Sequence, residues 1–241
     1  MKLNIDIVTP VHNEGETIKK TLEEFYDHYL NSKFEIHFIV SEDGSSDNSV
    51  SQINLIKENY SLTLISERYR KGYSKAVIDG LNLTKNKIVS FIDSDGQCDP
   101  ADLYNLYSHF NGSNLVVGYR NPRQDKMYRI VMSNLFKIVY KILFKINLRD
   151  PSCPFFITSK ENIDRILSTD EIGILSQGFW WEFYARADSL GINIVETPIN
   201  HRIRSGGKTV VYRPSKIPSI ATKHLFGLFK LKKICRDFKG K

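Results

Sequence analysis

Clusters of acidic and small polar residues follow three short apolar runs of the sequence. Asp93 and Asp95 come directly after the run at residues 88–92 and are separated by one small residue. Two carboxylates this close can reach one point, and oxygen-only ligands suit Mg²⁺ or Mn²⁺. A lone D-x-D pattern also fits a turn that leads into a helix. It gains weight here from two further polar clusters, at residues 9–14 and 42–47.

The cluster at residues 42–47, EDGSSD, holds two aspartates between an apolar run and a helical pattern. Asp47 has the position of a helix N-cap. Asp43 lies at the end of the apolar run, where its carboxylate can accept a hydrogen bond from a base or a ribose. The sequence has no G-x-G-x-x-G after its first run and no G-x-x-x-x-G-K-[ST], so it does not favour a dinucleotide-binding or P-loop protein.

Parallel strands would bring these clusters together. Apolar runs rich in β-branched residues alternate with longer helical patterns, as βαβ units require. Strands are expected at residues 4–8, 35–40, 62–65, 88–92 and 115–118, and helices at residues 16–31, 47–58, 74–84 and 100–110. This alternation predicts an α/β fold with a mostly parallel sheet flanked by helices, and a ligand site at the carboxyl ends of the strands.

Composition and length set the class of protein. The chain has 241 residues, of which 41% are hydrophobic and 25% charged, which excludes a disordered or fibrous protein. Three distant cysteines, Cys98, Cys153 and Cys235, predict neither a disulfide framework nor a zinc site and favour a reducing compartment. We expect no signal peptide and no membrane-spanning helix, because lysines interrupt the most apolar segment.

The net charge of +7 is unevenly distributed along the chain. Residues 200–241 hold 12 Lys and Arg against one Asp, whereas the preceding residues are mildly acidic. A basic end attracts a polyanion, which could be a nucleic acid, an anionic membrane surface or phosphate groups. We expect one domain over residues 1–210 and a basic amphipathic tail at residues 211–241.

A second basic amphipathic pattern lies near residues 125–149. Steps of four residues give one mostly cationic row: Arg129, Ser133, Lys137, Lys141, Lys145 and Arg149. Aromatic and aliphatic residues fill the other faces, so the segment could lie in a lipid headgroup layer. The alternative is that its apolar face packs on the protein. Further along, Trp180 and Trp181 could form a sugar or acceptor wall or part of the core, and Glu182 is a candidate acceptor-side acid.

The ordered set of motifs resembles the nucleotide-diphospho-sugar glycosyltransferases of family 2, which have the GT-A fold. The matching segments are TPVHNEGETI, EDGSSDNS, RKGYSKAVIDGL and DSDGQCDP. Within that family the strongest likeness is to the polyprenyl-phosphate sugar synthases of the dolichol-phosphate mannose synthase type, through D-x-D-x-Q, G-x-R and the late segment ETPINHRIRSGGKTV. RDPSCPFF lacks a usual glycine and GGKT replaces a small-Ser-Lys pattern, which leaves the acceptor less defined than the donor.

The resemblance implies a role for each matching residue. The donor-binding residues would be Pro10, Asn13, Glu14, Asp43, Lys71, Gly72, Lys75 and Ser94, although Lys71 and Lys75 also fit surface lysines. Asp93, Asp95 and Gln97 would hold a divalent ion, Mg²⁺ or Mn²⁺, and Asp93, Asp95 and Arg120 would be catalytic. The acceptor phosphate would be bound by Arg129, Ser133, Arg202, Arg204 and Lys208.

The implied activity is an inverting transfer of a sugar from a GDP-sugar or UDP-sugar to a membrane-associated acceptor, polyprenyl phosphate above all. Elongation of a cell-surface glycan is the alternative within the family. From another class, a basic nucleic-acid-binding or membrane-binding protein without catalysis would explain the tail but not the acidic clusters. We therefore expect a peripheral protein on the cytoplasmic face of an anionic membrane, with no nucleic-acid partner. A transmembrane partner that anchors it is compatible with this pattern.

Overall fold

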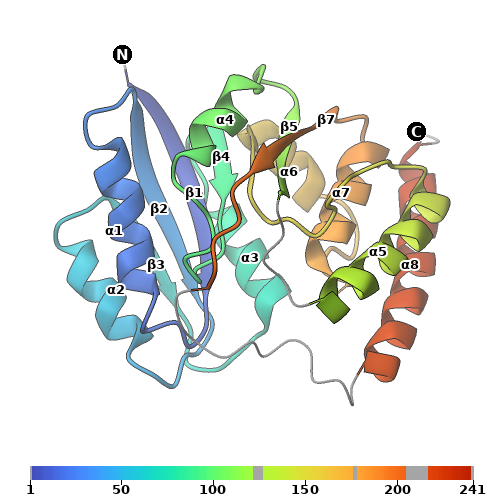
Figure 1. Ribbon diagram of the computed structural model, residues 1–241, viewed down its shortest axis with the longest axis horizontal. Coiled ribbons are helices and arrows are strands. Elements are labelled where there is room, and N and C mark those ends of the chain that lie inside the picture. The colour runs from blue at the N-terminus through green and yellow to red at the C-terminus, as the bar shows by residue number, and fades with distance from the viewer. Residues whose placement is uncertain (1, 122–126, 176–177, 205–216, 240–241) are drawn as a thin grey trace.

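A computed structural model of the chain describes residues 2–121, 127–175, 178–204 and 217–239, with only the backbone described for residues 127–132, 217–225 and 239 (Figure 1). The strands are β1 (Leu3–Val11), β2 (Phe34–Glu42), β3 (Leu62–Ser66), β4 (Ile88–Phe91), β5 (Leu115–Arg120), β6 (Phe156–Ser159) and β7 (Ile194–Ile199). The helices are α1 (Ile18–Tyr29), α2 (Ser49–Lys57), α3 (Tyr73–Asn82), α4 (Asp102–Ser108), α5 (Met127–Phe144), α6 (Lys160–Leu167), α7 (Phe179–Ser189) and α8 (Ile217–Lys239).

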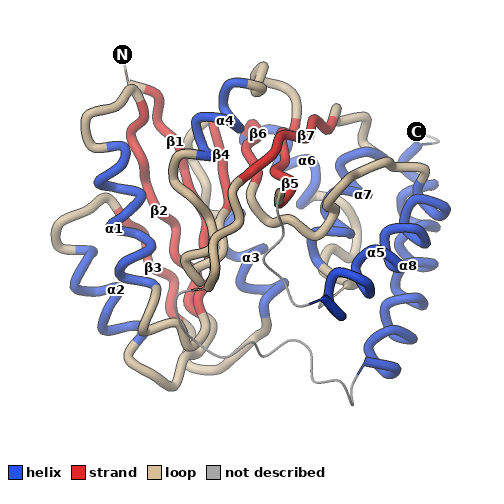
Figure 2. The backbone as a smooth tube through the Cα atoms, viewed as in Figure 1, coloured by secondary structure: helices blue, strands red, loops and turns tan. Residues whose placement is uncertain are grey.

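The described strands form one sheet in the order β3-β2-β1-β4-β6-β5-β7 (Figure 2). Strands β1 to β4 are parallel where they pair, and β5 is parallel to β7. Strand β6 runs antiparallel to both β4 and β5. The expected mostly parallel sheet is confirmed. Strand β6 was not predicted from the sequence, because only Phe156 and Ile157 of its residues are apolar, and a hydrophobic pattern does not show the direction of a strand.

Helices cover both faces of the sheet. Helices α1, α2 and α4 pack on one face, and α3, α6 and α7 pack on the other, where α5 and α8 add an outer layer. Because β1 starts at the upper edge in Figure 1, the carboxyl ends of the parallel strands β1 and β2 lie at the lower edge. The amino end of α8 lies toward the same edge.

The second amphipathic segment is partly buried and shorter than expected. Helix α5 ends at Phe144, and Lys145 follows with a left-handed φ of 61°. Arg149 therefore does not continue the cationic row, which is a correction to the expected helix at residues 125–149. Its guanidinium lies 4.7 Å from the ring centre of Tyr119. Tyr140 is 1% exposed and packs against a ring of α7.

The described part of the basic tail, α8, also packs on the body of the protein. Leu228, Leu231 and Cys235 of α8 are buried in the same core cluster as α7. By contrast, Phe226 and Phe229 of α8 are exposed. In the described ranges, no helix is long and apolar enough to cross a bilayer.

One expected helix start needs correction. The N-cap position of α2 is occupied by Asn48, one residue after Asp47. Asp47 still accepts a hydrogen bond from the helix, at 2.9 Å from the Ser49 backbone nitrogen. Its other oxygen accepts one from the Gly15 backbone at 3.0 Å. The carboxylate thus joins the start of α2 to the loop after β1.

Candidate active site

The loops after β1 and β2 are bound to each other by hydrogen bonds at the carboxyl edge of the sheet. The Asn13 backbone donates to the Ser45 hydroxyl at 2.9 Å, and the Ser46 backbone donates to the Asn13 side chain at 2.8 Å. Asn13 adopts a left-handed φ of 56°, which asparagine tolerates better than most residues. Pro10 lies within β1, opposite Ser41 of β2.

The loop after β4 joins the same cluster. The backbone carbonyl of Ser94 accepts a hydrogen bond from the Thr17 hydroxyl at 3.2 Å, just before α1. The predicted convergence of three polar loops is therefore what the structure shows. The sequence could predict this convergence because neighbouring parallel strands end at one edge of a sheet.

Asp93 and Asp95 interact electrostatically at this edge, and both are half-buried. Burial, followed by the charge of Asp95, raises the pKa of Asp93 to about 7. The Tyr73 hydroxyl and the charges of Arg120 and Arg204 lower it. Burial also raises the pKa of Asp95, against the charge of Arg204. Two destabilised carboxylates next to cationic groups would gain from a bound divalent cation.

The segment after β7 brings two arginines to these loops. An isolated antiparallel β-bridge joins His201 to Cys98, directly after the DSDGQ loop. The Arg202 backbone also donates a hydrogen bond to the Gln97 carbonyl at 3.0 Å. The guanidinium of Arg204 is paired with Glu14 and lies 3.8 Å from Asp95. Arg204 is thus on the side of the expected donor and ion groups.

Arg202 points elsewhere. Its guanidinium is paired with Glu24 of α1 and lies 3.1 Å from Asp99. The expectation that Arg202 and Arg204 share one face toward an acceptor does not match this geometry. The bridge at His201 holds the backbone, and each arginine reaches a different acidic partner.

Arg120, the last residue of β5, is held by a partner that the sequence analysis missed. Its Nε and Nη2 atoms donate to the two oxygens of Asp150 at 2.6 and 2.8 Å. Glu196 of β7 accepts hydrogen bonds from the backbone of Arg149 and Asp150, and so fixes the loop that carries Asp150. The one available signal was the acid in RDPSCPFF, which has no pattern that singles it out.

Asp43 is bound by the start of α3. Its carboxylate accepts hydrogen bonds from the backbone nitrogens of Lys71 and Gly72, the latter at 2.9 Å. Gly72 has a φ of 98°, which a residue with a side chain rarely adopts. The amines of Lys71 and Lys75 lie on Asp79, at 2.6 and 2.8 Å. Both lysines thus pair with one acid of α3, which fits the surface alternative, and their role in donor binding stays a prediction.

The side chains that could hold an ion fit Mg²⁺ or Mn²⁺ better than a metal that needs a full protein cage. Among the described residues, no three His, Cys, Asp or Glu side chains gather to hold a metal. Two carboxylates without His or Cys suit a cation that takes its other ligands from water and substrate phosphates. The Gln97 amide donates to the Arg202 carbonyl at 3.0 Å, so it also holds the segment after β7.

Several other candidates have structural partners. Trp180 and Trp181 are 6% and 7% exposed and belong to the core. Glu182 is fully buried and paired with Arg186 at 2.7 Å, so it is not available as an acceptor-side acid. The spacing of four residues could have indicated this pair. Ser133 lies on α5, and the side chains of Arg129 and Lys208 fall outside the described residues.

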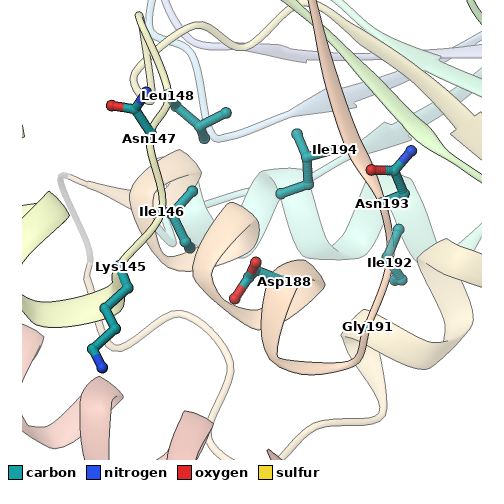
Figure 3. Close-up of a pocket in the computed structure, with 9 residues that line it drawn as sticks. All are labelled: Lys145, Ile146, Asn147, Leu148, Asp188, Gly191, Ile192, Asn193 and Ile194. Carbon is teal, nitrogen blue, oxygen red and sulfur yellow. The ribbon is translucent and has the colours of Figure 1, made fainter.

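A cavity of 430 Å³ lies elsewhere in the protein, between the loop after α5 and the turn into β7 (Figure 3). Its lining includes Lys145, Asp188 and Asn193. This is the amino end of β7, whereas Arg202 and Arg204 follow its carboxyl end. The cavity is therefore not part of the candidate active site.

Comparisons with known proteins agree with this geometry. A family model described as glycosyl transferase family 2 matches residues 6–167. The chain is 27% identical over 175 residues to the undecaprenyl-phosphate 4-deoxy-4-formamido-L-arabinose transferase of Proteus mirabilis, across 70% of this chain and 53% of that protein. An uncharacterized glycosyltransferase of Mycobacterium bovis is 24% identical over 217 residues, 86% of this chain and 89% of that protein.

A solved structure shows the fold. It is glucosyl-3-phosphoglycerate synthase from Mycobacterium tuberculosis in complex with Mn²⁺, UDP-glucose and phosphoglyceric acid. The likeness has a TM-score of 0.69 at 17% identity and covers 96% of this chain and 80% of that one. The fold is therefore GT-A, as expected. The chain spans about half the length of the Proteus transferase.

Proposed function

The chain belongs to glycosyl transferase family 2, and on that premise we propose that it transfers a sugar from a nucleotide-diphospho-sugar to polyprenyl phosphate, with inversion at the sugar carbon. The donor is a UDP-sugar or a GDP-sugar, and the reaction uses Mg²⁺ or Mn²⁺. The acceptor class follows the Proteus relative, which acts on undecaprenyl phosphate by its name. A structural neighbour holds Mn²⁺ with a UDP-sugar, which supports the donor and the ion.

One observation carries the proposal. Asp93 and Asp95 follow β4, and the charges of Arg120 and Arg204 both lower the pKa of Asp93. Opposite charges placed in this way suit a diphosphate and its ion better than a neutral sugar alone. Asp43 lies at the end of β2 in the same row of strand ends and would bind the nucleoside.

The reaction needs little covalent chemistry from the protein. An acceptor phosphate oxygen attacks the anomeric carbon, the bond from that carbon to the diphosphate oxygen breaks, and the electron pair leaves with the nucleoside diphosphate. A divalent ion, when bound, neutralises the charge that develops on this leaving group. Arg204, placed by the segment after β7, would bind the diphosphate, and Arg120 would steady the reacting phosphates.

The charge pairing in the site favours a phosphate acceptor over a hydroxyl. A hydroxyl acceptor needs a general base, whereas a lipid monophosphate, with a second pKa of about 6, arrives already ionised. Glu14 is paired with Arg204, and Asp150 is paired with Arg120. Both carboxylates are engaged by guanidinium groups, so a hydroxyl acceptor would have to compete with Arg204 or Arg120 for either of them.

An exposed apolar face supports membrane attachment. Leu135, Ile138 and Ile142 of α5 are 58%, 57% and 71% exposed and follow helical spacing, and exposed Lys141 lies on the adjacent strip. Helix α8 contacts α5 and exposes Phe226 at 80%. Burying each such side chain contributes about 1.5–3 kcal/mol, and each nearby lysine about 1 kcal/mol on an anionic surface. We propose that this face rests on the cytoplasmic leaflet.

A donor screen tests the proposal. The full chain would be incubated with UDP-sugars and GDP-sugars, Mg²⁺ or Mn²⁺ and a short polyprenyl phosphate, and the released nucleoside diphosphate would be measured. Release should require both the ion and the lipid phosphate. Release that depends on an oligosaccharide instead of the lipid phosphate would favour glycan elongation and refute the proposed acceptor.

A further inference from the structure

A chain of three side chains connects the core to Asp93. The indole Nε1 of Trp180 donates a hydrogen bond to the Tyr73 hydroxyl at 2.9 Å, and that hydroxyl donates to Oδ1 of Asp93 at 2.9 Å. An indole nitrogen can only donate, so the Tyr73 oxygen must accept from it. The single hydroxyl hydrogen is then directed to the carboxylate. The polarity of the chain is thus fixed from the core toward Asp93.

The far end of the chain is rigid because Trp180 lies in the aromatic core. Its ring centre is 4.4 Å from that of Phe91, the last residue of β4, and 5.6 Å from that of Phe156 in β6. Phe91 precedes Asp93 by two residues, so the same packing that places the indole also places the strand end. Displacement of the indole would therefore shift the position of both the Tyr73 hydroxyl and the backbone that carries the Asp93 carboxylate.

The middle residue of this hydrogen-bonded series, Tyr73, lies in the first turn of α3. Tyr73 is the first residue of that helix, directly after Gly72, whose backbone nitrogen binds Asp43. Two consecutive residues, Gly72 and Tyr73, thus bind Asp43 and Asp93 of the candidate donor site.

We propose that Tyr73 is a positioning residue for the divalent ion, acting through Asp93, and that Trp180 sets the orientation of its hydroxyl. This rests on the proposed function, in which Asp93 binds the ion of the donor diphosphate. Hydrogen bonds to a ligating carboxylate restrict its rotation, and loss of such a partner typically weakens metal affinity by 10- to 100-fold. Neither residue touches the reacting atoms.

Calorimetry tests this with binding as the readout. UDP and, separately, GDP would be titrated into the full chain at a series of Mn²⁺ concentrations, and the Mn²⁺ midpoint for nucleotide binding would be determined. Tyr73→Phe should raise that midpoint by about 10-fold or more. Trp180→Phe should raise it by a smaller factor, because the hydroxyl remains but loses its fixed orientation.

The matched control is Tyr140→Phe. Tyr140 is buried and Tyr73 is half-buried, and the Tyr140 hydroxyl likewise donates one hydrogen bond, to the Trp181 carbonyl at 2.9 Å, away from the acidic loops. Its removal should lower the melting temperature without moving the Mn²⁺ midpoint. A purely structural role for Tyr73 predicts the same behaviour for Tyr73→Phe, and that result would overturn the proposal.

Failure of the underlying function looks different. Asp93→Asn and Asp95→Asn should abolish the Mn²⁺ dependence of nucleotide binding. If both variants keep the wild-type midpoint, the ion site itself is wrong and the positioning role falls with it. If they lose the dependence while Tyr73→Phe and Trp180→Phe keep the wild-type midpoint, the ion site stands and only the positioning role is refuted.

Discussion

The buried ion pair of α7 provides a quantitative test of the packing. Glu182 and Arg186 are both fully buried, with Nη2 and Oε1 2.7 Å apart. Glu182 also accepts hydrogen bonds from the backbone of Gly173 and Leu175 at 2.9 and 2.8 Å. Arg186 donates to the carbonyl of Asp170 at 2.8 Å. The pair thus ties the loop before α7 to the helix.

The perturbation is Glu182→Gln, which keeps the shape but leaves the guanidinium of Arg186 buried without a counter-charge. Removing one partner of a buried pair costs about 3–5 kcal/mol. For a chain of this length each kcal/mol shifts the melting temperature by about 2–4 °C, so a fall of roughly 6–20 °C is expected. Urea unfolding and calorimetry would measure the two quantities.

The matched control is Glu23→Gln on α1, which has the same four-residue spacing. Glu23 and Lys19 are 3.7 Å apart with side chains 38% and 43% exposed, so its loss should cost at most about 0.5 kcal/mol. If Glu182→Gln cost no more than Glu23→Gln, the buried pair would not hold the loop and the reasoning would be refuted. A loss of turnover in molecules that remain folded would instead restore Glu182 as a catalytic acid.

Four further outcomes are expected. Asp95→Asn should lower transfer by about 10²-fold with an intact fold, and near wild-type turnover that still needs the ion would contradict the assignment. Asp43→Ala should weaken binding of the nucleoside diphosphate by about 10-fold or more, and unchanged affinity in calorimetry would make Asp43 a turn residue only. Replacing Lys137 and Lys141 with Glu should reduce binding to anionic vesicles by about 30-fold or more, and the wild-type protein should bind these vesicles more weakly at high salt. If the wild-type protein bound neutral vesicles equally well, the electrostatic part of the membrane proposal would be wrong. Burial raises the pKa of Asp102 to about 6, so its ionisation destabilises the folded protein as pH rises through that value. Relative to Asp102→Asn, the wild-type unfolding free energy should therefore fall by about 1 kcal/mol between pH 5 and pH 7. Parallel plots of unfolding free energy against pH for the two proteins would show that Asp102 has an ordinary pKa.

The fold and the convergence of the loops could be predicted from the sequence because they follow from periodicity and strand order. Apolar runs mark β1, β2 and β4, and parallel strands place their following loops at one edge. The antiparallel β6 could not be predicted in this way. A hydrophobic pattern does not show the direction of a strand, and the place of β6 in the sheet is set by partners far away in the chain.

Side-chain pairing was the least predictable feature. The sequence indicates that Arg202 and Arg204 carry charge but not which acids they meet, since Glu24 and Glu14 are about 180 positions away along the chain. Tyr73 was missed for a related reason: only the packed core shows that the indole of Trp180 reaches its hydroxyl. Long-range pairing depends on the assembled fold, which local patterns do not contain.

The most direct test of the proposed activity is the identity of its lipid product. Mass spectrometry of a reaction with the active nucleotide-sugar, Mn²⁺ and a short polyprenyl phosphate should show one sugar added to the phosphate for each nucleoside diphosphate released. Proton NMR of that product should show the anomeric configuration opposite to that of the donor. Nucleoside diphosphate released without any glycosylated lipid, or a product with the donor's configuration, would contradict an inverting polyprenyl-phosphate transferase.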